Sequence, residues 1–217
     1  SASVLSAKVV GGVPGKHTHV IFKLDNPPSH KASEGQGAAL YYNDVRQFGW
    51  IKAVKSEELK VKDDFIRKLG PEPNVNPKNP PEKILTLDEF KKILSKTRRT
   101  IKTVLMDQEK IGGVGNIYAN DALWFAGVDP KKSADKLGNE EIEKLFGAIH
   151  TVLKNGLKYG GASELAFVTP DGKEGEYQNH TLVYGHEGQL CERCHKSIIK
   201  KFFLSGRGTY FCPVCQN

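Results

Sequence analysis

The chain has 217 residues, of which 38% are hydrophobic and 26% charged, enough for one large or two small domains with a buried core. Its 32 Lys and Arg residues outnumber its 25 Asp and Glu residues, so its formal net charge is +7 at pH 7. The composition excludes disorder of the whole chain, and no apolar run approaches the roughly 18 residues that span a bilayer. The first ten residues lack the pattern of a secretion signal. We expect a soluble intracellular protein with an anionic partner, for which nucleic acid is a commoner choice than a membrane.

The N-terminal part is expected to be rich in β-strands. Residues 16–25 alternate between the two faces of a strand, and residues 26–37 have the Pro, Ser, Gly and charge content of a loop. Residues 38–54 predict two further short strands around an Asn-Asp turn. Residues 70–81 hold five prolines and three asparagines, which predicts a linker between two domains.

Helices are expected after this linker. Thr86 and Glu89 form a capping box ahead of an apolar stripe, and a second helical run includes residues 101–105. Three glycines in residues 112–115 interrupt the pattern before a new helix opens at Asn116. The sequence therefore predicts a helix, a tight double turn and another helix.

The C-terminal third begins with a strongly periodic helix over residues 139–159. Residues 160–190 are rich in Gly and polar residues and predict a loop, and loops of that length are usually functional or mobile. Residues 197–204 and 209–212 predict a β-hairpin closed by cysteines.

All four cysteines lie in the last 27 residues, as two C-x2-C pairs separated by 17 residues. A disulfide framework would usually spread its cysteines through a small secreted domain, whereas this spacing is typical of four thiolates around zinc. The sequence predicts one structural zinc ion held by Cys191, Cys194, Cys212 and Cys215.

A basic segment, residues 91–102, has six basic residues and no acid directly ahead of the glycine turn. Most such runs form a solvated helix face. A Gly-rich turn that opens a helix at Asn116 also presents free N–H groups and the positive end of a helix dipole, which suits a phosphate. Lys102 would face the same phosphate. Helix packing and anion binding stay open as alternatives here.

Three further places suit contact with nucleic acid. Arg207 lies between two glycines at the hairpin tip, where it either contacts a phosphate or stays an exposed turn residue. Arg46 and Phe48, two apart, point to one side, where they either pack ordinarily or wedge a base step and contact the unpaired base. His17 is expected on a strand, with phosphate contact as the alternative.

These segments resemble the formamidopyrimidine-DNA glycosylase / endonuclease VIII family of base-excision repair enzymes. The matching motifs follow the family's order along nearly the whole chain: KHTHVIF, YNDVRQFG, LGPEP, TIKTVLMDQEKIGGVGNIYANDALWFAGVDP, YGGAS, VYGHEGQLCERC and SGRGTYFCPVC. The resemblance implies an α+β fold with a partial β-sandwich over residues 1–69, a linker over 70–82, a helix–two-turn–helix domain with a lesion loop over 83–185, and a zinc finger over 186–217. Double-stranded damaged DNA would lie between the domains.

The resemblance also implies roles for the phosphate contacts. Asn116 and Lys102 match residues that grip phosphates at the lesion, and His17 and Arg98 lie in or near other phosphate-contacting positions. Arg207 matches the finger arginine that holds a phosphate and donates a proton in the second elimination step.

Other implied roles concern the bases. Arg46 matches the contact to the base opposite the lesion, and Phe48 matches the intercalating wedge. Residues 162–177 correspond to the loop that folds over the flipped base. Asp121 stands where the family usually has glutamate, and its shorter side chain is expected to weaken contacts there.

The resemblance implies that the nucleophile is the amine of an N-terminal proline followed by glutamate, whereas this sequence begins Ser-Ala-Ser. We expect the nucleophile to lie outside this chain, since Ser1 aligns inside the sandwich, away from the proline's place. The intact family fold is expected to be a monomer, whereas this chain alone would expose sheet edges and associate through them.

We therefore expect a bifunctional DNA glycosylase and AP lyase that flips and excises oxidised purines, such as 8-oxoguanine and formamidopyrimidine, and nicks the strand in the cytoplasm of a bacterium, at the nucleoid. One alternative is a non-catalytic homologue that binds damaged DNA. Another is a zinc-ribbon protein of the ribosomal or transcription type, which would leave Arg46 and Phe48 without a role.

Overall fold

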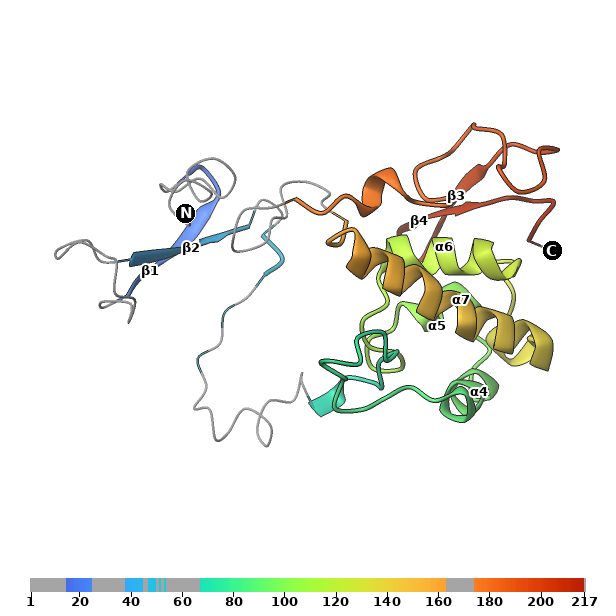
Figure 1. Ribbon diagram of the computed structural model, residues 1–217, viewed down its shortest axis with the longest axis horizontal. Coiled ribbons are helices and arrows are strands. Elements are labelled where there is room, and N and C mark those ends of the chain that lie inside the picture. The colour runs from blue at the N-terminus through green and yellow to red at the C-terminus, as the bar shows by residue number, and fades with distance from the viewer. Residues whose placement is uncertain are drawn as a thin grey trace. The chain divides into compact units, whose positions relative to one another are not determined.

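A computed structural model describes residues 15–24, 38–44, 47–49, 51, 53, 67–162 and 174–216 (Figure 1). The chain divides into two compact units. The first comprises Ser1–Val54 and Ala162–Glu176, and the second comprises Lys55–Gly161 and Tyr177–Asn217. The helices and the cysteine-rich tail thus belong to one unit.

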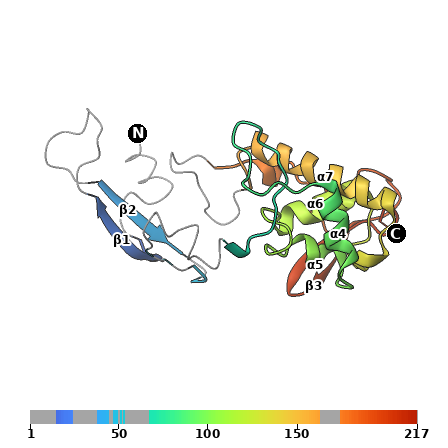
Figure 2. The same cartoon turned by 90° about the horizontal axis from the view of Figure 1, so that it is seen from below.

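The first unit contains an antiparallel pair of strands, β1 (Thr18–Leu24) and β2 (Ala38–Asn43), seen side by side in Figures 1 and 2. These two strands confirm the alternating pattern of residues 16–25 and the first strand expected after residue 37. In the register of the pair, Phe22 faces Leu40.

The second strand expected in residues 38–54 is not found among the described residues 47–49, 51 and 53. The Asp44 carboxylate explains part of this difference, because it accepts hydrogen bonds from the backbone N–H groups of Gln47 (2.9 Å) and Gly49 (2.7 Å). A side chain thus takes the donors that a neighbouring strand would otherwise bind, and the chain turns.

The second unit holds the helices and a C-terminal hairpin (Figure 2). Its elements are α4 (Leu87–Ser95), α5 (Ile101–Leu105), α6 (Asn116–Ala126), the 3-10 helix η3 (Ala134–Lys136), α7 (Asn139–Lys158), the 3-10 helix η4 (Tyr177–Asn179), β3 (Lys200–Leu204) and β4 (Arg207–Phe211). The expected helices, double turn and hairpin are all confirmed. Among the described residues, no helix is long and apolar enough to cross a membrane.

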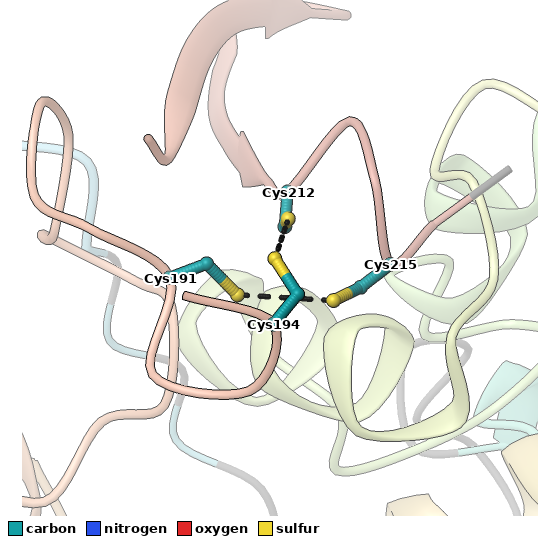
Figure 3. Close-up of side chains that lie close together, drawn as sticks. All are labelled: Cys191, Cys194, Cys212 and Cys215. Carbon is teal, nitrogen blue, oxygen red and sulfur yellow. Dashed lines mark hydrogen bonds between the residues drawn. The ribbon is translucent and has the colours of Figure 1, made fainter. Parts of the chain in front are cut away.

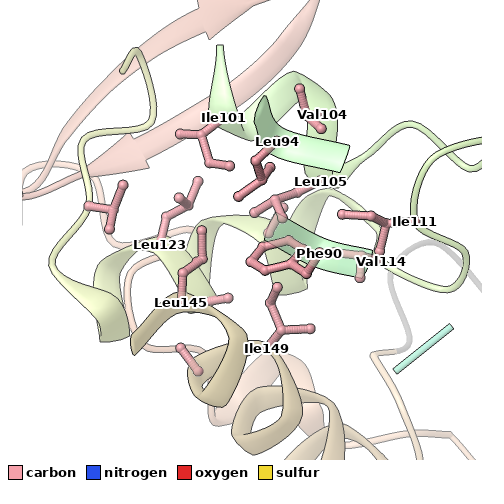
Figure 4. Close-up of a cluster of buried hydrophobic side chains, with 14 of the residues drawn as sticks. Phe90, Leu94, Ile101, Val104, Leu105, Ile111, Val114, Leu123, Leu145 and Ile149 are labelled. Atoms are coloured by element: carbon pink, nitrogen blue, oxygen red, sulfur yellow. The ribbon is translucent and has the colours of Figure 1, made fainter. Parts of the chain in front are cut away.

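The helices of the second unit surround one hydrophobic core (Figure 4). Phe90 and Leu94, four residues apart on α4, are fully buried, as are Leu145 and Ile149 of α7. This spacing puts each pair on one face of its helix, so the stripes that the sequence shows become the packed surface. The Thr86–Glu89 capping box is also present at the start of α4.

The proline-rich segment after residue 69 is held on the helical unit by backbone hydrogen bonds. The Gly70 N–H donates to the carbonyl of Gln108 (2.8 Å), and the Pro71 carbonyl accepts from Gly112 (3.1 Å). A Cβ on Gly70 would come within 2.5 Å of the backbone of Lys110, so only glycine allows this approach. The segment lies directly against the double turn before α6.

Candidate nucleic-acid interface and metal centre

The four cysteines gather at the end of the hairpin (Figure 3). Their sulfur atoms lie within 4.8 Å of one another, with 3.8 Å between Cys191 and Cys215 and 3.7 Å between Cys194 and Cys212. Disulfide sulfurs would be about 2.05 Å apart. Tetrahedral thiolates bound to zinc at about 2.3 Å have sulfurs about 3.8 Å apart. The cysteines are therefore positioned to hold one tetrahedral metal ion.

The surroundings of the four sulfurs shift their pKa values in different directions: burial and the neighbouring sulfurs raise the pKa of Cys212 and of Cys215, whereas the Lys196 N–H lowers that of Cys194. Burial raises the pKa of the Cys191 thiol, but backbone N–H groups of Cys194 and Arg193 and other nearby donors outweigh this effect and lower it to about 6. The indole of Trp124, packed in the same buried cluster, is one of the donors that lower the Cys191 pKa, and its Nε1 makes no other hydrogen bond among the described residues. A thiolate of Cys191 is an acceptor suited to this buried donor.

The cysteine cluster is attached to the C-terminal end of α6. The Arg193 guanidinium lies 4.2 Å from the Trp124 ring centroid and donates to the carbonyl of Phe125 (3.0 Å). The Gln216 side chain accepts from the Cys212 N–H and donates to the Val128 carbonyl, each at 2.9 Å. These contacts join the finger to the C-terminal end of α6.

The double turn presents the N-terminal end of α6. The Gln108 side chain braces the turn, because it accepts from the Gly113 N–H (2.9 Å) and donates to the Val114 carbonyl (3.0 Å). Gly115 is the N-cap residue and has no side chain to cap the helix. The first N–H groups of α6 are therefore left for an external acceptor, beside the half-buried Asn116.

Lys102 on α5 is 1% exposed and reaches the finger. Its ammonium donates to the Gly208 carbonyl (2.7 Å) and to the Thr209 hydroxyl (2.8 Å). Burial, followed by repulsion from the nearby Arg207 guanidinium, lowers the pKa of Lys102 to about 7. A buried amine with neutral acceptors gains strongly from an anion next to it.

Lys102 and Arg207 share the lining of a pocket of about 220 Å³. The remaining lining residues are Arg99, Thr103, Met106, Asp107, Leu204 and Ser205. Arg99 and Asp107 form an ion pair at 2.6 Å, so the net positive charge of the pocket comes from Arg207 and from Lys102 when Lys102 is protonated. An anion of phosphate size fits this chemistry.

The other residues expected to contact DNA are dispersed. The side chain of Arg98, ahead of α5, is 93% exposed, with Nε 3.8 Å from Asp135. His17 lies in the turn before β1, not on the strand as expected, and Phe48 of the same unit is 77% exposed. Arg46 lies outside the described residues.

The loop expected to fold over a flipped base is described only at its ends. Ala162 and Glu176 pair there as an isolated bridge, and residues 163–173 lie outside the described part. The shorter Asp121 side chain nevertheless finds three donors: the Tyr177 hydroxyl (2.9 Å) and the backbone N–H groups of Val183 (3.0 Å) and Tyr184 (3.1 Å). Asp121 thus ties α6 to the chain that leaves this loop.

Asn120, which is 1% exposed on α6, is a residue of this site that the sequence did not indicate. It contacts both Asn116 and the backbone of β4. The available signal was its spacing of four residues from Asn116, which puts the two amides on one helix face. Its partners on β4 are 88 and 90 residues away, and nothing local indicates them.

Comparison with known proteins agrees with this architecture. The family model described as "Formamidopyrimidine-DNA glycosylase H2TH domain" matches residues 69–167. The chain is 36% identical to the formamidopyrimidine-DNA glycosylase of Desulfitobacterium hafniense, over 94% of this chain and 67% of the relative, and 38% identical to that of Listeria innocua, over 93% and 67%.

Solved structures of the same group superpose on the chain. The MutM (Fpg) protein of Thermus thermophilus gives a TM-score of 0.75 at 31% identity, over 94% of this chain and 70% of that one. The Lactococcus lactis Fpg, in a complex with abasic-site DNA, gives a TM-score of 0.71 at 32% identity, over 91% and 70%. With its double turn, its four clustered cysteines and these relatives, the chain belongs to the formamidopyrimidine-DNA glycosylase family.

Proposed function

We propose that this chain supplies the DNA-binding and zinc-finger parts of a DNA glycosylase and AP lyase that removes oxidised purines from double-stranded DNA. The observation that carries the proposal is the pocket in which Lys102 and Arg207 meet, because it offers two cations to one anion. Family membership supports it, as do the solved complexes of Lactococcus lactis Fpg with abasic-site DNA and with Fapy-dG DNA. The setting would be bacterial DNA, in the cytoplasm at the nucleoid.

The geometry of the second unit supports three phosphate-binding roles. Lys102 and Arg207 neutralise one backbone phosphate in their shared pocket, while Asn116 and the open N–H groups of α6 bind a phosphate next to it. The exposed Arg98 adds a further phosphate contact. After base removal, Arg207 also supplies the proton of the second elimination step.

The first unit supplies the contacts to bases. Phe48, with 77% of its surface exposed, enters the stack as a wedge, and Arg46 contacts the base opposite the lesion. His17 contacts a phosphate. An exposed aromatic side chain gains free energy when bases cover it, so exposure of this kind supports the wedge role.

One zinc ion is the metal we assign to Cys191, Cys194, Cys212 and Cys215. When bound, it cross-links the four thiolates and fixes the finger without taking part in bond breaking. The residues around it hold the hairpin, and therefore Arg207, against α6.

Binding to a duplex with 8-oxoguanine opposite cytosine, beside an undamaged duplex, tests the proposal. We expect preference for the damaged duplex, and we expect Arg207→Ala and Asn116→Ala to weaken binding and Arg207→Ala to lower the salt dependence by about one counterion. Lys154→Ala, which removes an exposed cation on α7, is the matched control. Equal affinity for both duplexes, with Arg207→Ala no weaker than the control, would overturn the proposal.

Borohydride trapping on the same duplex separates chemistry from binding. Reduction of a Schiff base to a stable adduct would show that an amine of this chain attacks the damaged nucleotide. Selective binding without an adduct would support the DNA-binding role and assign the 217-residue chain no nucleophile of its own.

A further inference from the structure

Asn120 makes an unusual set of contacts for a buried amide. Its Oδ1 accepts the backbone N–H of Tyr210 at 2.8 Å. Its Nδ2 donates to the Asn116 carbonyl at 2.8 Å and lies 3.4 Å from both the Asn116 Oδ1 and the Gly208 carbonyl oxygen. One side chain on α6 thus joins the first residue of that helix to the finger.

The contacts to the finger follow the pattern of a β-sheet. Gly208 and Tyr210 are two apart on β4, so the carbonyl of the first and the N–H of the second point to the same side of the strand. This side is opposite β3, which makes it the free edge of a two-stranded sheet. The amide of Asn120 offers an acceptor and a donor to that edge, as a peptide group of a third strand would.

The contact to Asn116 sets the direction of a second amide. An amide has one accepting and one donating end. Because the Nδ2 of Asn120 faces the Oδ1 of Asn116, the NH2 group of Asn116 is the end left for an anion.

The hairpin is also fixed from α5. The Gly208 carbonyl accepts from Lys102 as well as from Asn120, so two helices hold the residue that follows Arg207. The position of Arg207 relative to Asn116 therefore depends on a small number of buried hydrogen bonds, and Asn120 is the residue that contacts both sides.

We propose that Asn120 is a positioning residue that holds Asn116 and Arg207 in one arrangement, so that the two bind DNA as a unit. This inference rests on the proposed function. Two contacts that share a rigid frame lose free energy together, because removal of one leaves the phosphate poorly placed for the other.

A double-mutant cycle measures this coupling directly. Affinity for a duplex with an abasic-site analogue is measured for Asn116→Ala, Arg207→Ala and the double variant, first with Asn120 and then with Asn120→Ala. With Asn120 present, we expect the two substitutions to be coupled. The fold loss of affinity in the double variant should be smaller, by a factor of at least about five, than the product of the two single fold losses. With Asn120→Ala, we expect the losses to multiply within about twofold.

The outcomes separate this inference from the proposed function. Single losses that multiply even with Asn120 present would overturn the positioning role and leave DNA binding intact. Coupling that survives Asn120→Ala would also overturn it, because another residue would then carry the coupling. If neither single variant weakens binding, the proposed function fails and this inference with it.

Asn120→Asp provides a second variant in case Asn120→Ala does not fold. It keeps the acceptor for Tyr210 and removes the donor toward Asn116 and Gly208, so we expect loss of coupling with β4 still attached. Asn155→Asp makes the same change at an exposed position on α7 and controls for the added charge. An unchanged coupling in Asn120→Asp would contradict the proposal.

Hydrogen exchange gives a readout that needs no variant. The Tyr210 N–H lies on the free edge of the hairpin, so in the intact protein it is protected only if Asn120 accepts it. We expect its exchange to be slowed to the level of the N–H groups that pair β3 with β4. Rapid exchange at Tyr210 would overturn the proposal.

Discussion

At the scale of single residues, the second unit concentrates unusual polar groups on α5 and α6. Lys102, Asn120 and Asp121 are each no more than 1% exposed, although polar side chains of this kind rarely avoid water completely. Each has hydrogen-bond partners from distant parts of the chain. These residues therefore join elements that lie far apart in the sequence, which local sequence patterns do not predict.

Lys102 predicts a pH dependence of DNA binding. In the free protein its pKa is about 7, and a phosphate beside it favours the charged form, so binding takes up a proton above pH 7. Affinity should then fall as pH rises from about 7 to about 9, by at most about tenfold per pH unit. Binding isotherms across this range measure the effect.

Lys102→Met tests the origin of that dependence. The variant should bind more weakly at neutral pH and lose most of the slope, whereas Lys154→Met should keep the slope. A slope that persists in Lys102→Met would assign the proton to another group.

Replacing Tyr177 with Phe is expected to lower the stability of the second unit while its fold is kept. The Tyr177 hydroxyl donates to the buried Asp121 carboxylate, and burial raises the pKa of that carboxyl despite its hydrogen bonds. Tyr177→Phe leaves one carboxylate oxygen without this donor and should lower the free energy of unfolding by about 1–3 kcal/mol. Denaturant unfolding measures it, with Tyr159→Phe as a control on a half-buried ring; equal losses would contradict the assignment.

At the scale of elements, periodicity and caps carried most of the sequence prediction. The stripe on α7 and the capping box of α4 are local properties of the chain, and both are present in the structure. The cysteine spacing likewise sufficed to predict the cluster, because two C-x2-C pairs leave few arrangements. The second strand expected in residues 38–54 is not seen among the described residues 47–49, 51 and 53, and the Asp44 side chain binds the N–H groups of Gln47 and Gly49 instead.

The contacts of the candidate site that the sequence could not predict share one physical reason: they join residues far apart in the chain. The contacts of Lys102 and Asn120 with β4 span 88 to 107 residues of sequence. Such pairs depend on how the finger docks, which neither propensity nor hydrophobic period encodes. The resemblance to a family placed Lys102 at a phosphate, but its buried bond to Thr209 emerged only in three dimensions.

Removal of the metal is predicted to release the finger but spare the helices. Without it, four thiols in one small cluster have no common partner, so β3 and β4 should lose their order. The core around Phe90 and Leu145 contains no cysteine and should keep its helical circular dichroism. Chelation followed by hydrogen exchange checks both parts, and protected amides in β4 after full metal loss would contradict the prediction.

At the scale of the whole molecule, the two units differ in how much hydrophobic surface their described residues bury. The second has its own hydrophobic core, and the proline-rich segment predicted as a linker is bonded to it at Gly70 and Pro71. Within the described part of the first unit, Val20, Ile21 and Phe22 are each more than a third exposed. The second unit should therefore unfold in a transition of its own, from which its free energy of unfolding can be measured.

Phe90→Ala should lower the free energy of unfolding of the second unit by about 3–5 kcal/mol, because it opens a cavity between α4 and α7. Thermal unfolding followed by helical circular dichroism measures the loss. Phe125→Ala, at a ring 47% exposed on α6, should cost far less. Similar losses for both would contradict the assigned core.

Gly115 has a further consequence for how this protein can evolve. A Cβ there would meet no atom within 4 Å, and its φ of −94° is open to every residue, so sterics do not require glycine. Serine would cap α6 and stabilise the helix by a few tenths of a kcal/mol. It would do so by occupying the very N–H groups that we assign to a phosphate. A Gly115→Ser variant is therefore expected to gain helix stability and to lose affinity for DNA, so stability and binding make opposite demands on this position.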